Sequence, residues 1–330
     1  MTQKNSIDIS VYVLTYYHEK YIRDALDSIL SQRTAYRFEI VVSDDCSGDK
    51  TSEILAEYEK NYPDIIRVNR NTENIGIPGN IFKARCLCRG RYIVNLAGDD
   101  YWINDRKLQI QADFLENNPE YLAVCTRVEL RKGSSVKADV VLPPLKETDR
   151  EYTMADFENG RNCNTHGMMM RNLFLTEEGR NYFSASGQIS NIVDDAIDNY
   201  LLIKRGRVYT MSVVTDAYRI TDKEEHAHSY NASYSAFEKI KQDIEIYNRM
   251  AEIYGNETDF KKRYINSVAK MEVFFMLSKD KNKWLSLYKT IPEKFRKPFF
   301  KSLIIQSVPR MNSLVINRLI PSSVKQMLAK

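Results

Sequence analysis

Asp99 and Asp100 are adjacent carboxylates that directly follow an apolar, strand-like segment, residues 92–96. Two neighbouring carboxylates repel each other unless a cation is present. Their hard oxygen atoms suit Mg²⁺ or Mn²⁺, which proteins typically bind through one or two carboxylates plus substrate phosphates. An Asp pair is also common on solvated turns and at helix starts. The pair by itself therefore indicates either a divalent-cation site or a capping turn.

A second acidic pair, Asp44–Asp45, closes another strand-like segment, residues 38–42. A turn that caps the following helix is one interpretation of this pair. The other is a hydrogen-bond acceptor for a nucleobase N–H. Thr15 and Tyr16 directly follow the first apolar segment, residues 9–14, and the Tyr16 ring could stack on such a base.

A third pair, Asp194–Asp195, begins a predicted helix over residues 194–204. Carboxylates are favoured at a helix N-terminus by the helix dipole, which is a purely structural reason for the pair. The same dipole keeps an Asp ionised at neutral pH, as a general base must be. Both interpretations stay open on the local sequence.

The elements that must position these residues alternate along the first 125 residues. The predicted strands are residues 9–14, 38–42, 65–68, 92–96 and 121–124. The predicted helices are residues 22–30, 51–62 and 108–115, with one more of about ten residues after Gly79. Such alternation predicts an α/β fold with a mostly parallel, doubly wound sheet, whose ligands bind beyond the carboxyl ends of strands. Three of the polar clusters fall at those ends.

The rest of the chain is less regular. Residues 126–225 are mixed, with predicted strands at 167–170 and 208–214, and the chain is helical beyond about residue 234. The net charge of the 330 residues is only +4, yet residues 281–330 hold eleven basic residues and one acidic residue, Glu293. Apolar residues at helical spacing among these lysines predict an amphipathic helical appendage or a contact with an anionic membrane surface. The stretch has no nucleic-acid-binding motif, so we expect no nucleic-acid partner.

Three features of the sequence bear on the cellular compartment of the protein. The N-terminus is polar, no apolar run is long enough to span a bilayer, and the five cysteines are an odd, scattered set without zinc-site spacing. We therefore expect reduced thiols and a cytoplasmic protein.

Four segments, in order, resemble the motifs of the family 2 glycosyltransferases, which have the GT-A fold. Residues 11–32 resemble the opening strand and helix, residues 38–51 the "DDGSxDxT" motif, and residues 73–80 the "N-x-G" turn. Residues 89–108 resemble a bacterial "GkYIalxxGDDYW…KL" variant. The resemblance covers about residues 7–220.

The resemblance implies a donor site for a nucleotide-diphosphate sugar. Thr15 and Tyr16 would line the base pocket, and Asp45 would accept a hydrogen bond from the base. Asp99 would contact the ribose or share the metal shell, and Asp100 would ligate the Mg²⁺ or Mn²⁺ ion that bridges the diphosphate. Asn80 and Arg85 are weaker candidates for the diphosphate side.

On the acceptor side, Asp194–Asp195 matches the family's "ED" pair, which makes Asp195 the base that deprotonates the acceptor hydroxyl. His166 could touch the acceptor sugar, and His226 or His228 could add a nitrogen ligand to the metal. The implied reaction inverts the anomeric centre. We expect it to serve bacterial cell-surface polysaccharide or glycoconjugate synthesis, with a saccharide or lipid-linked saccharide as acceptor.

Three residues depart from the family pattern: Tyr17 stands for an Asn, Cys46 for a Gly, and Ala97 for the first carboxylate of a D-x-D motif. The missing carboxylate leaves Asp100 with most of the metal assignment.

The resemblance also implies a domain plan. Residues 1–225 would form the GT-A catalytic domain, with a nucleotide-sugar half (1–125) and an acceptor half (126–225). Residues 226–330 would form a helical C-terminal region, basic from about residue 281, which could hold the protein on the inner face of the plasma membrane. Two alternatives remain: a sugar-phosphate nucleotidyltransferase, which should have a Gly-rich phosphate loop near the N-terminus, and a non-catalytic nucleotide-sugar-binding protein.

Overall fold

Ten strands form one mixed sheet in the part of the chain that the structure describes. The structure is a computed structural model, and it describes residues 6–132, 135–142, 145–163, 165–184, 189–190, 195–220, 235–255, 259–264 and 266–267. The chain divides into two units, Met1–Phe157 with Arg161–Ser233 and Glu158–Gly160 with Tyr234–Lys330. The sheet belongs to the first unit.

The sheet has the strand order β3-β2-β1-β4-β9-β6-β10-β5, with β7 on β6 and β8 on β10. The first four of these strands are parallel, as are β6 and β10, and β9 runs antiparallel to both β4 and β6. The strands are β1 Ile9–Thr15, β2 Phe38–Asp44, β3 Ile66–Arg70, β4 Tyr92–Ala97, β5 Tyr101–Trp102, β6 Tyr121–Lys132, β7 Ser135–Leu142, β8 Arg150–Tyr152, β9 Met168–Arg171 and β10 Arg207–Arg219.

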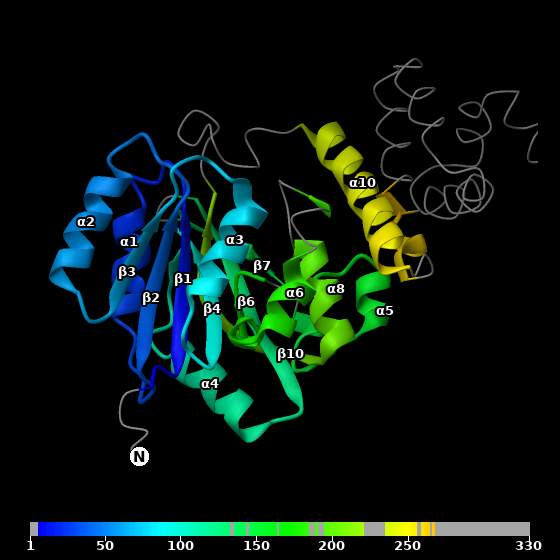
Figure 1. Cartoon of the computed structure of the whole chain (residues 1–330). Coiled ribbons are helices and arrows are strands. Elements are labelled where there is room, and N and C mark those ends of the chain that lie inside the picture. Colours follow the sequence, from blue (N-terminus) through cyan, green and yellow to red (C-terminus); the bar gives the residue numbers. More distant parts are fainter. Residues whose placement is uncertain are drawn as a thin grey trace, which may run out of the picture. The chain divides into compact units, whose positions relative to one another are not determined.

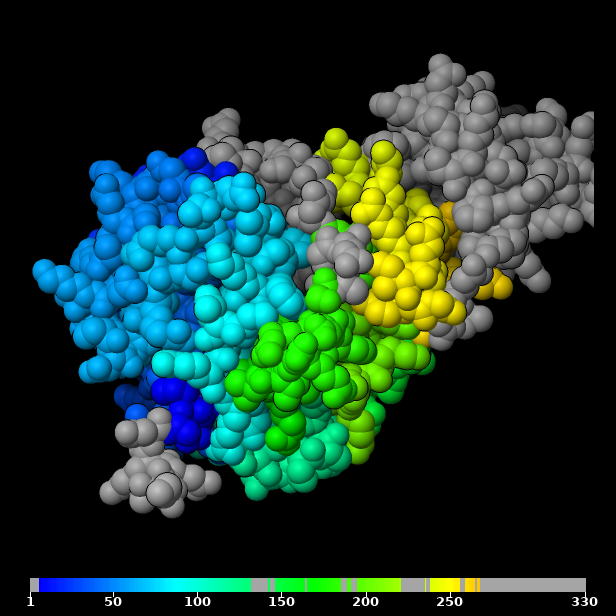
Figure 2. Space-filling model, viewed as in Figure 1, coloured from blue at the N-terminus to red at the C-terminus, as the bar shows by residue number. Residues whose placement is uncertain are grey.

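The helices that the structure describes are α1 Ile22–Leu30, α2 Thr51–Asn61, α3 Gly76–Leu87, α4 Lys107–Asn117, α5 Met154–Glu158, α6 Glu177–Ser184, α8 Asp195–Arg205 and α10 Ala236–Tyr254, with short 3-10 turns η1 Leu145–Glu147 and η2 Leu173–Leu175. The helices of the first unit lie between the strands in the sequence, and α1, α2, α3, α4 and α8 contact the sheet, whereas α10 follows β10 and belongs to the second unit. Figure 1 shows α3 in front of the parallel strands, and α3 contacts both β1 and β2. The side chains around α3, in light blue and cyan, cover these strands from the same side (Figure 2).

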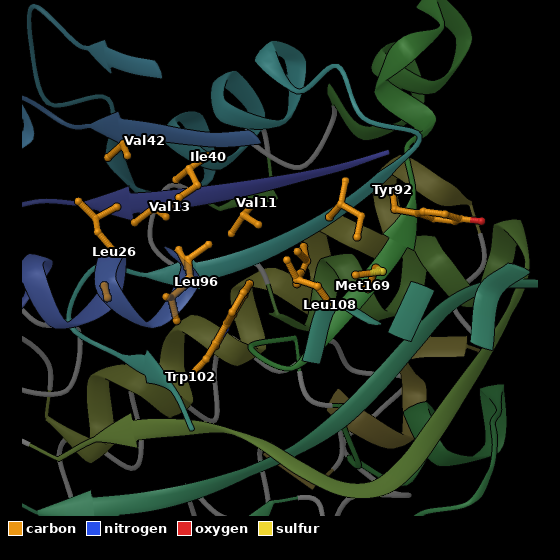
Figure 3. Packing of buried hydrophobic residues seen from close by; sticks show 14 of the residues in the cluster. Val11, Val13, Leu26, Ile40, Val42, Tyr92, Leu96, Trp102, Leu108 and Met169 are labelled. Atoms are coloured by element: carbon orange, nitrogen blue, oxygen red, sulfur yellow. The ribbon is translucent and has the colours of Figure 1, made fainter. Parts of the chain in front are cut away.

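The core explains why the predicted strands and helices are confirmed, most of them to within two residues at each end. Strand β6 runs eight residues and β10 five residues past the predicted ends, and α3 begins at Gly76, within the predicted turn. Val11 and Val13 of β1 are fully buried beside Ile40 and Val42 of β2, and Leu26 of α1 packs on them (Figure 3). Burial of each such side chain contributes roughly 1.5–3 kcal/mol, so β-branched runs with both faces covered form strands reliably. None of the described helices is long and apolar enough to span a bilayer.

The second unit is described through α10 and a short segment after it. Ser235 accepts a hydrogen bond from the backbone of Glu238, and the Glu238 carboxylate accepts one from the backbone of Ser235, which is a complete capping box. Gly255 ends the helix with a positive φ of 66°. The helix predicted beyond residue 234 is thus present, whereas residues 281–330 lie outside the described part of the chain.

Candidate active site at the carboxyl ends of the strands

The ends of β1, β2 and β4 bring the three polar clusters together. Thr15 is in register with Asp44, and Leu14 with Ala97. Beyond the strands, the Asp45 N–H donates to the Thr15 carbonyl oxygen at 3.0 Å, and the Gly98 N–H donates to the Leu14 carbonyl oxygen at 2.8 Å. The clusters therefore share one edge of the sheet, as the parallel topology predicts.

Thr15 places a hydroxyl at this edge that the protein itself does not satisfy. Its side chain is 2% exposed, and its Oγ1 has no hydrogen-bond partner within the described residues. A buried hydroxyl without a partner costs free energy, so such an atom suits a ligand that supplies the missing bond. The neighbouring Tyr16 is half-buried and packs edge-to-face on Tyr17, with ring centroids 4.7 Å apart.

Two of the departures from the family pattern occupy left-handed backbone positions. Tyr17 has φ 58° and Cys46 has φ 67°. Asn and Gly, the residues expected there, adopt this conformation at lower cost than other residues, so the two positions store strain beside the site. The turn is held by the Tyr17 N–H, which donates to Ser47 Oγ at 2.9 Å. A Cβ at Gly48 would lie 2.5 Å from Tyr17 Oη, so a larger residue there would require the Tyr17 ring to move.

Asp45 holds the start of helix α3. Its Oδ1 accepts from the Ile75 N–H and from Asn71 Nδ2, both at 2.9 Å, and its Oδ2 accepts from the Gly76 N–H at 3.0 Å. Asp45 therefore caps the start of α3, not the following helix α2 to which the capping interpretation referred. Oδ2 retains capacity for a second donor, because a carboxylate oxygen can accept two hydrogen bonds.

Asn80 braces the end of β2 from helix α3. Its Oδ1 accepts from Ser43 Oγ at 2.6 Å and from Asn71 Nδ2 at 3.0 Å, while its Nδ2 donates to the Ser43 carbonyl oxygen at 3.0 Å. The side chain is buried. The amide thus has a structural role in shaping the edge on which Asp45 lies.

Asp100 is a buried carboxylate in an unfavourable electrostatic environment. It is 3% exposed, and its Oδ1 accepts from the Arg219 N–H at 2.8 Å. Burial first, and then the nearby carboxylates of Asp99 and Asp216, raise the pKa of Asp100 well above its ordinary value. A bound cation would relieve both effects, and the half-buried Asp99 lies next to it.

Two consecutive residues connect Asp100 with Asp195. The Nδ1 atom of His166 lies 3.7 Å from Asp100 Oδ2, and the hydroxyl of Thr165 donates to Asp195 Oδ1. Asp195 is exposed and is the first residue of α8. The predicted metal ligand and the predicted base are therefore on the two sides of one dipeptide.

The sequence motifs and the strand-end geometry correspond to one known family. Residues 10–176 match the model of glycosyl transferase family 2. The chain belongs to this family. The match covers both the carboxyl ends of β1, β2 and β4 and the Thr165–His166 dipeptide.

Relatives within the family are similar over part of their length. An uncharacterized protein of Mycobacterium tuberculosis is 36% identical over 140 residues, which are 42% of this chain and 39% of that protein. A Bacillus subtilis protein, provisionally named the teichuronic acid biosynthesis glycosyltransferase TuaG, is 37% identical over 107 residues, 32% of this chain and 41% of that protein. The chain thus spans about two fifths of these relatives' length.

Solved structures show the same fold. The structure of S. aureus TarS 1-349 in complex with UDP-GlcNAc has a TM-score of 0.60 at 17% identity and covers 88% of this chain and 83% of that chain. The mannosyltransferase PcManGT from Pyrobaculum calidifontis, in complex with GDP-Man and Mn2+, has a TM-score of 0.54 at 16% identity and covers 99% and 81%. The GT-A fold predicted from the sequence is therefore confirmed.

Arg219 is a site residue that the family motifs did not single out. Besides its backbone bond to Asp100, its Nε donates to the Asp99 carbonyl oxygen at 2.9 Å and its Nη2 to Asp24 Oδ2 at 2.8 Å. The guanidinium carbon lies 4.9 Å from the ring centroids of both Tyr21 and Tyr101. Arg219 thus holds the Asp99–Asp100 turn in place. No sequence pattern links residues that lie 120 positions apart.

Two buried ion pairs involve elements that carry site residues. Lys107 Nζ donates to both carboxylate oxygens of Asp216, at 3.0 and 2.8 Å, and burial lowers the pKa of the Lys107 amine. Arg85, a weaker diphosphate candidate in the sequence, is buried and donates to both carboxylate oxygens of Asp198. Neither pair could be predicted, because each joins residues more than 100 positions apart.

Several predicted features lie outside the described residues: Asp194, His226, His228 and residues 281–330. Among the residues described, no group of three or more His, Cys, Asp or Glu side chains is arranged to hold a metal ion. All five cysteines have free thiols, and Cys46 is the exposed one. A cation at Asp100 would therefore need oxygen ligands from the substrate, as is usual for Mg²⁺.

Proposed function

We propose that this family 2 protein transfers a sugar from a nucleotide-diphosphate donor to an acceptor hydroxyl, with inversion, in the synthesis of a bacterial cell-surface polysaccharide or glycoconjugate. The observation that carries this proposal is the position of two consecutive residues. Thr165 contacts the base candidate Asp195, and His166 lies beside the metal-ligand candidate Asp100. An acceptor hydroxyl near both groups would be within reach of a donor sugar. Asp195 is exposed and Asp100 is buried, and such different environments suit the different roles of base and metal ligand.

The donor pocket is assigned to the edge formed by β1, β2 and α3. Thr15 supplies the unsatisfied hydroxyl and Tyr16 a ring for the base, while Asp45 Oδ2 accepts from a base N–H. Asn80 acts at the same edge, where its amide supports Ser43 and Asn71. Donors of this kind, UDP-GlcNAc and GDP-Man, are bound by TarS and PcManGT respectively.

Mg²⁺ or Mn²⁺ fits the acidic turn. Asp100 would hold the ion, with Asp99 as its neighbour, because a buried carboxylate with a raised pKa beside two further carboxylates favours a cation. When bound, the ion would offset the negative charge that develops on the departing diphosphate. His226 or His228 remains a candidate for an additional nitrogen ligand.

Asp195 removes the proton of the acceptor hydroxyl in the proposed reaction. The acceptor oxygen forms its new bond to the anomeric carbon from the face opposite the donor diphosphate, and the bond to the diphosphate oxygen breaks with its electron pair. Inversion follows from this single in-line displacement. Thr165 orients the Asp195 carboxylate through its hydroxyl, and His166 is placed to contact the acceptor sugar.

The wider assignments follow the same proposal. Residues 1–225 would be the catalytic domain and residues 226–330 a helical C-terminal region. Its basic part, residues 281–330, would contact an anionic membrane at the inner face of the plasma membrane, where a lipid-linked saccharide acceptor would lie. A saccharide in solution is the other acceptor class.

A donor screen tests the proposal. Thermal unfolding is followed with Mn²⁺ and UDP-, GDP- or dTDP-sugars, and donors that shift the midpoint are then tested for sugar-dependent release of the nucleoside diphosphate. A well-bound donor should stabilise the protein by a few kcal/mol through mass action, about 2.7 kcal/mol at a hundredfold excess over its Kd. Binding without transfer to any acceptor or to water would favour the non-catalytic alternative. No shift with any nucleotide sugar would contradict the proposal.

A further inference from the structure

We propose that the buried ion pair between Arg85 and Asp198 positions Asp195 relative to the donor edge, which makes Arg85 and Asp198 positioning residues. The inference rests on the proposed role of Asp195 as the base.

The pair has a two-point geometry that fixes direction as well as distance. Arg85 Nη1 donates to Asp198 Oδ1 at 3.0 Å and Nη2 donates to Oδ2. The third side of the guanidinium is also fixed, because Nε donates to the Tyr12 hydroxyl at 3.0 Å. Arg85 is 8% exposed and Asp198 is 3% exposed. The planar guanidinium fork therefore holds helix α3, strand β1 and helix α8 in one relative arrangement.

The aromatic surroundings of the pair indicate that it contributes more to positioning than to the stability of the fold. The guanidinium carbon lies 5.4 Å from the ring centroid of Tyr12, 5.7 Å from that of Phe174 and 6.0 Å from that of Phe183. In such an aromatic setting the desolvation of two charges offsets much of their attraction, and apolar side chains of similar size often stabilise a fold as well. The distinctive contribution of the pair is its geometry.

Asp195 and Asp198 are three residues apart, so both lie on the first turn of α8 and on neighbouring positions of its surface. A displacement of Asp198 must therefore move Asp195. The same turn is fixed from the other side by Asn199, whose Nδ2 donates to the Asp195 carbonyl oxygen at 2.6 Å and whose Oδ1 accepts from the Cys163 N–H at 2.9 Å. The Arg85 contact joins this turn of α8 to helix α3.

The other end of the pair lies on elements that form the donor edge. Tyr12 precedes Thr15 on β1, and Asn80 on α3 bonds to Ser43 at the end of β2. The pair thus connects the helix of the proposed base to the two elements proposed to hold the donor. Misplacement of a catalytic group by about 1 Å can lower a rate about a hundredfold.

The double variant Arg85→Met/Asp198→Leu separates positioning from stability. It replaces the pair with apolar side chains of similar size, which should keep the thermal midpoint close to that of the wild type. In the ligand-free variant, we expect the backbone amides of residues 199–201, which bond to the carbonyl oxygens of the first turn, to exchange with deuterium about tenfold faster, and those of residues 203–205 to be unchanged. With the donor that the screen selects, kcat should fall about a hundredfold while the donor Kd stays within about twofold.

The double variant Arg150→Met/Asp156→Leu is the matched control. It removes another two-point pair, with bonds of 2.7 and 2.9 Å, from β8 and α5, which carry no proposed site residue. Its kcat and the amide exchange of α8 should equal those of the wild type. If the first variant does not fold, the near-isosteric Asp198→Asn is measured in its place.

Unchanged exchange at residues 199–201, or faster exchange with unchanged kcat, would overturn the positioning role. A fall in kcat with an equal rise in donor Kd would also overturn it, because the pair would then shape the donor pocket. Asp195→Asn separates a failure of the proposed base from a failure of the positioning role. Normal turnover of Asp195→Asn refutes the proposed base, whereas an inactive Asp195→Asn beside a fully active Arg85→Met/Asp198→Leu refutes the positioning role only.

Discussion

The two sides of the candidate site are built in different ways. On the proposed donor side, three parallel strands in direct register end together, and backbone hydrogen bonds at 2.8 and 3.0 Å continue the alignment past Leu14 and Thr15. On the proposed acceptor side, β6 and β10 pair with register shifts around Val214, and the contacts of Asp195 and Asp100 are made by side chains from distant segments. A site edge made by backbone register is rigid, whereas one made by side chains depends on individual residues. We therefore expect donor-side changes to alter affinity and acceptor-side changes to alter turnover.

Asp195→Asn should have the largest effect and should act on turnover. Loss of the proposed base is expected to lower kcat by about 10²- to 10⁴-fold. The donor Kd should be unchanged, because the contacts of Asp195 are with Thr165 and Asn199, on the acceptor side. Steady-state kinetics and donor titration measure the two quantities. Near-normal turnover would remove Asp195 from the role.

Arg219→Met tests whether the Arg219 side chain is needed to hold the Asp99–Asp100 turn in place. The substitution keeps a long apolar stem between Tyr21 and Tyr101 but removes the bonds to Asp99 and Asp24. Mn²⁺-dependent donor affinity should fall by about 10- to 100-fold, the usual effect of removing support from a metal ligand. Titration calorimetry in Mn²⁺ provides the measurement, with Arg33→Met on an exposed surface pair as control. Equal affinities in the two variants would show that the turn does not need Arg219.

Thr15→Val should weaken donor binding without lowering stability. The buried Oγ1 has no partner within the described residues, so its removal should leave the free energy of unfolding unchanged or slightly higher. Loss of its proposed bond to the donor should weaken donor binding by about tenfold. Chemical denaturation and donor titration are both required. Thr15→Ser, which keeps the hydroxyl, should bind the donor like the wild type, and weaker binding by both variants would indicate a packing effect instead.

Cys46→Gly is the smallest predicted effect and concerns backbone strain on the donor side. Glycine relieves the cost of φ 67° at residue 46 but adds freedom to the unfolded chain, so the net gain should be about 0.5–1 kcal/mol in the free energy of unfolding. Cys46→Ala keeps the Cβ and should give no gain. A loss of stability in the glycine variant would mean that the Cys46 thiol contributes a contact that outweighs the strain.

The contrast between the two sides also explains how far the sequence could predict the molecule. Strands such as β1 and β2 were predicted almost to their ends, because their β-branched runs are buried on both faces and their polar ends mark the ligand edge. The two-residue strand β5 and the pairs Arg85–Asp198 and Lys107–Asp216 were not predicted. Such pairings depend on tertiary packing between segments that carry no shared local pattern. The strained positions of Tyr17 and Cys46 appeared in the sequence only as unexplained departures.

The dependence of donor binding on a divalent cation at Asp100 is the central claim, and donor titration calorimetry in Mn²⁺ and in EDTA tests it most directly. The wild type should lose donor affinity by about a hundredfold or more when Mn²⁺ is removed. Asp100→Asn, which removes the charge with little change in shape, should bind the donor weakly and equally under both conditions. Asp105→Asn, at an exposed carboxylate, serves as the control and should behave like the wild type. Donor affinity that is the same with and without Mn²⁺ in the wild type, or full Mn²⁺ dependence in Asp100→Asn, would contradict the account.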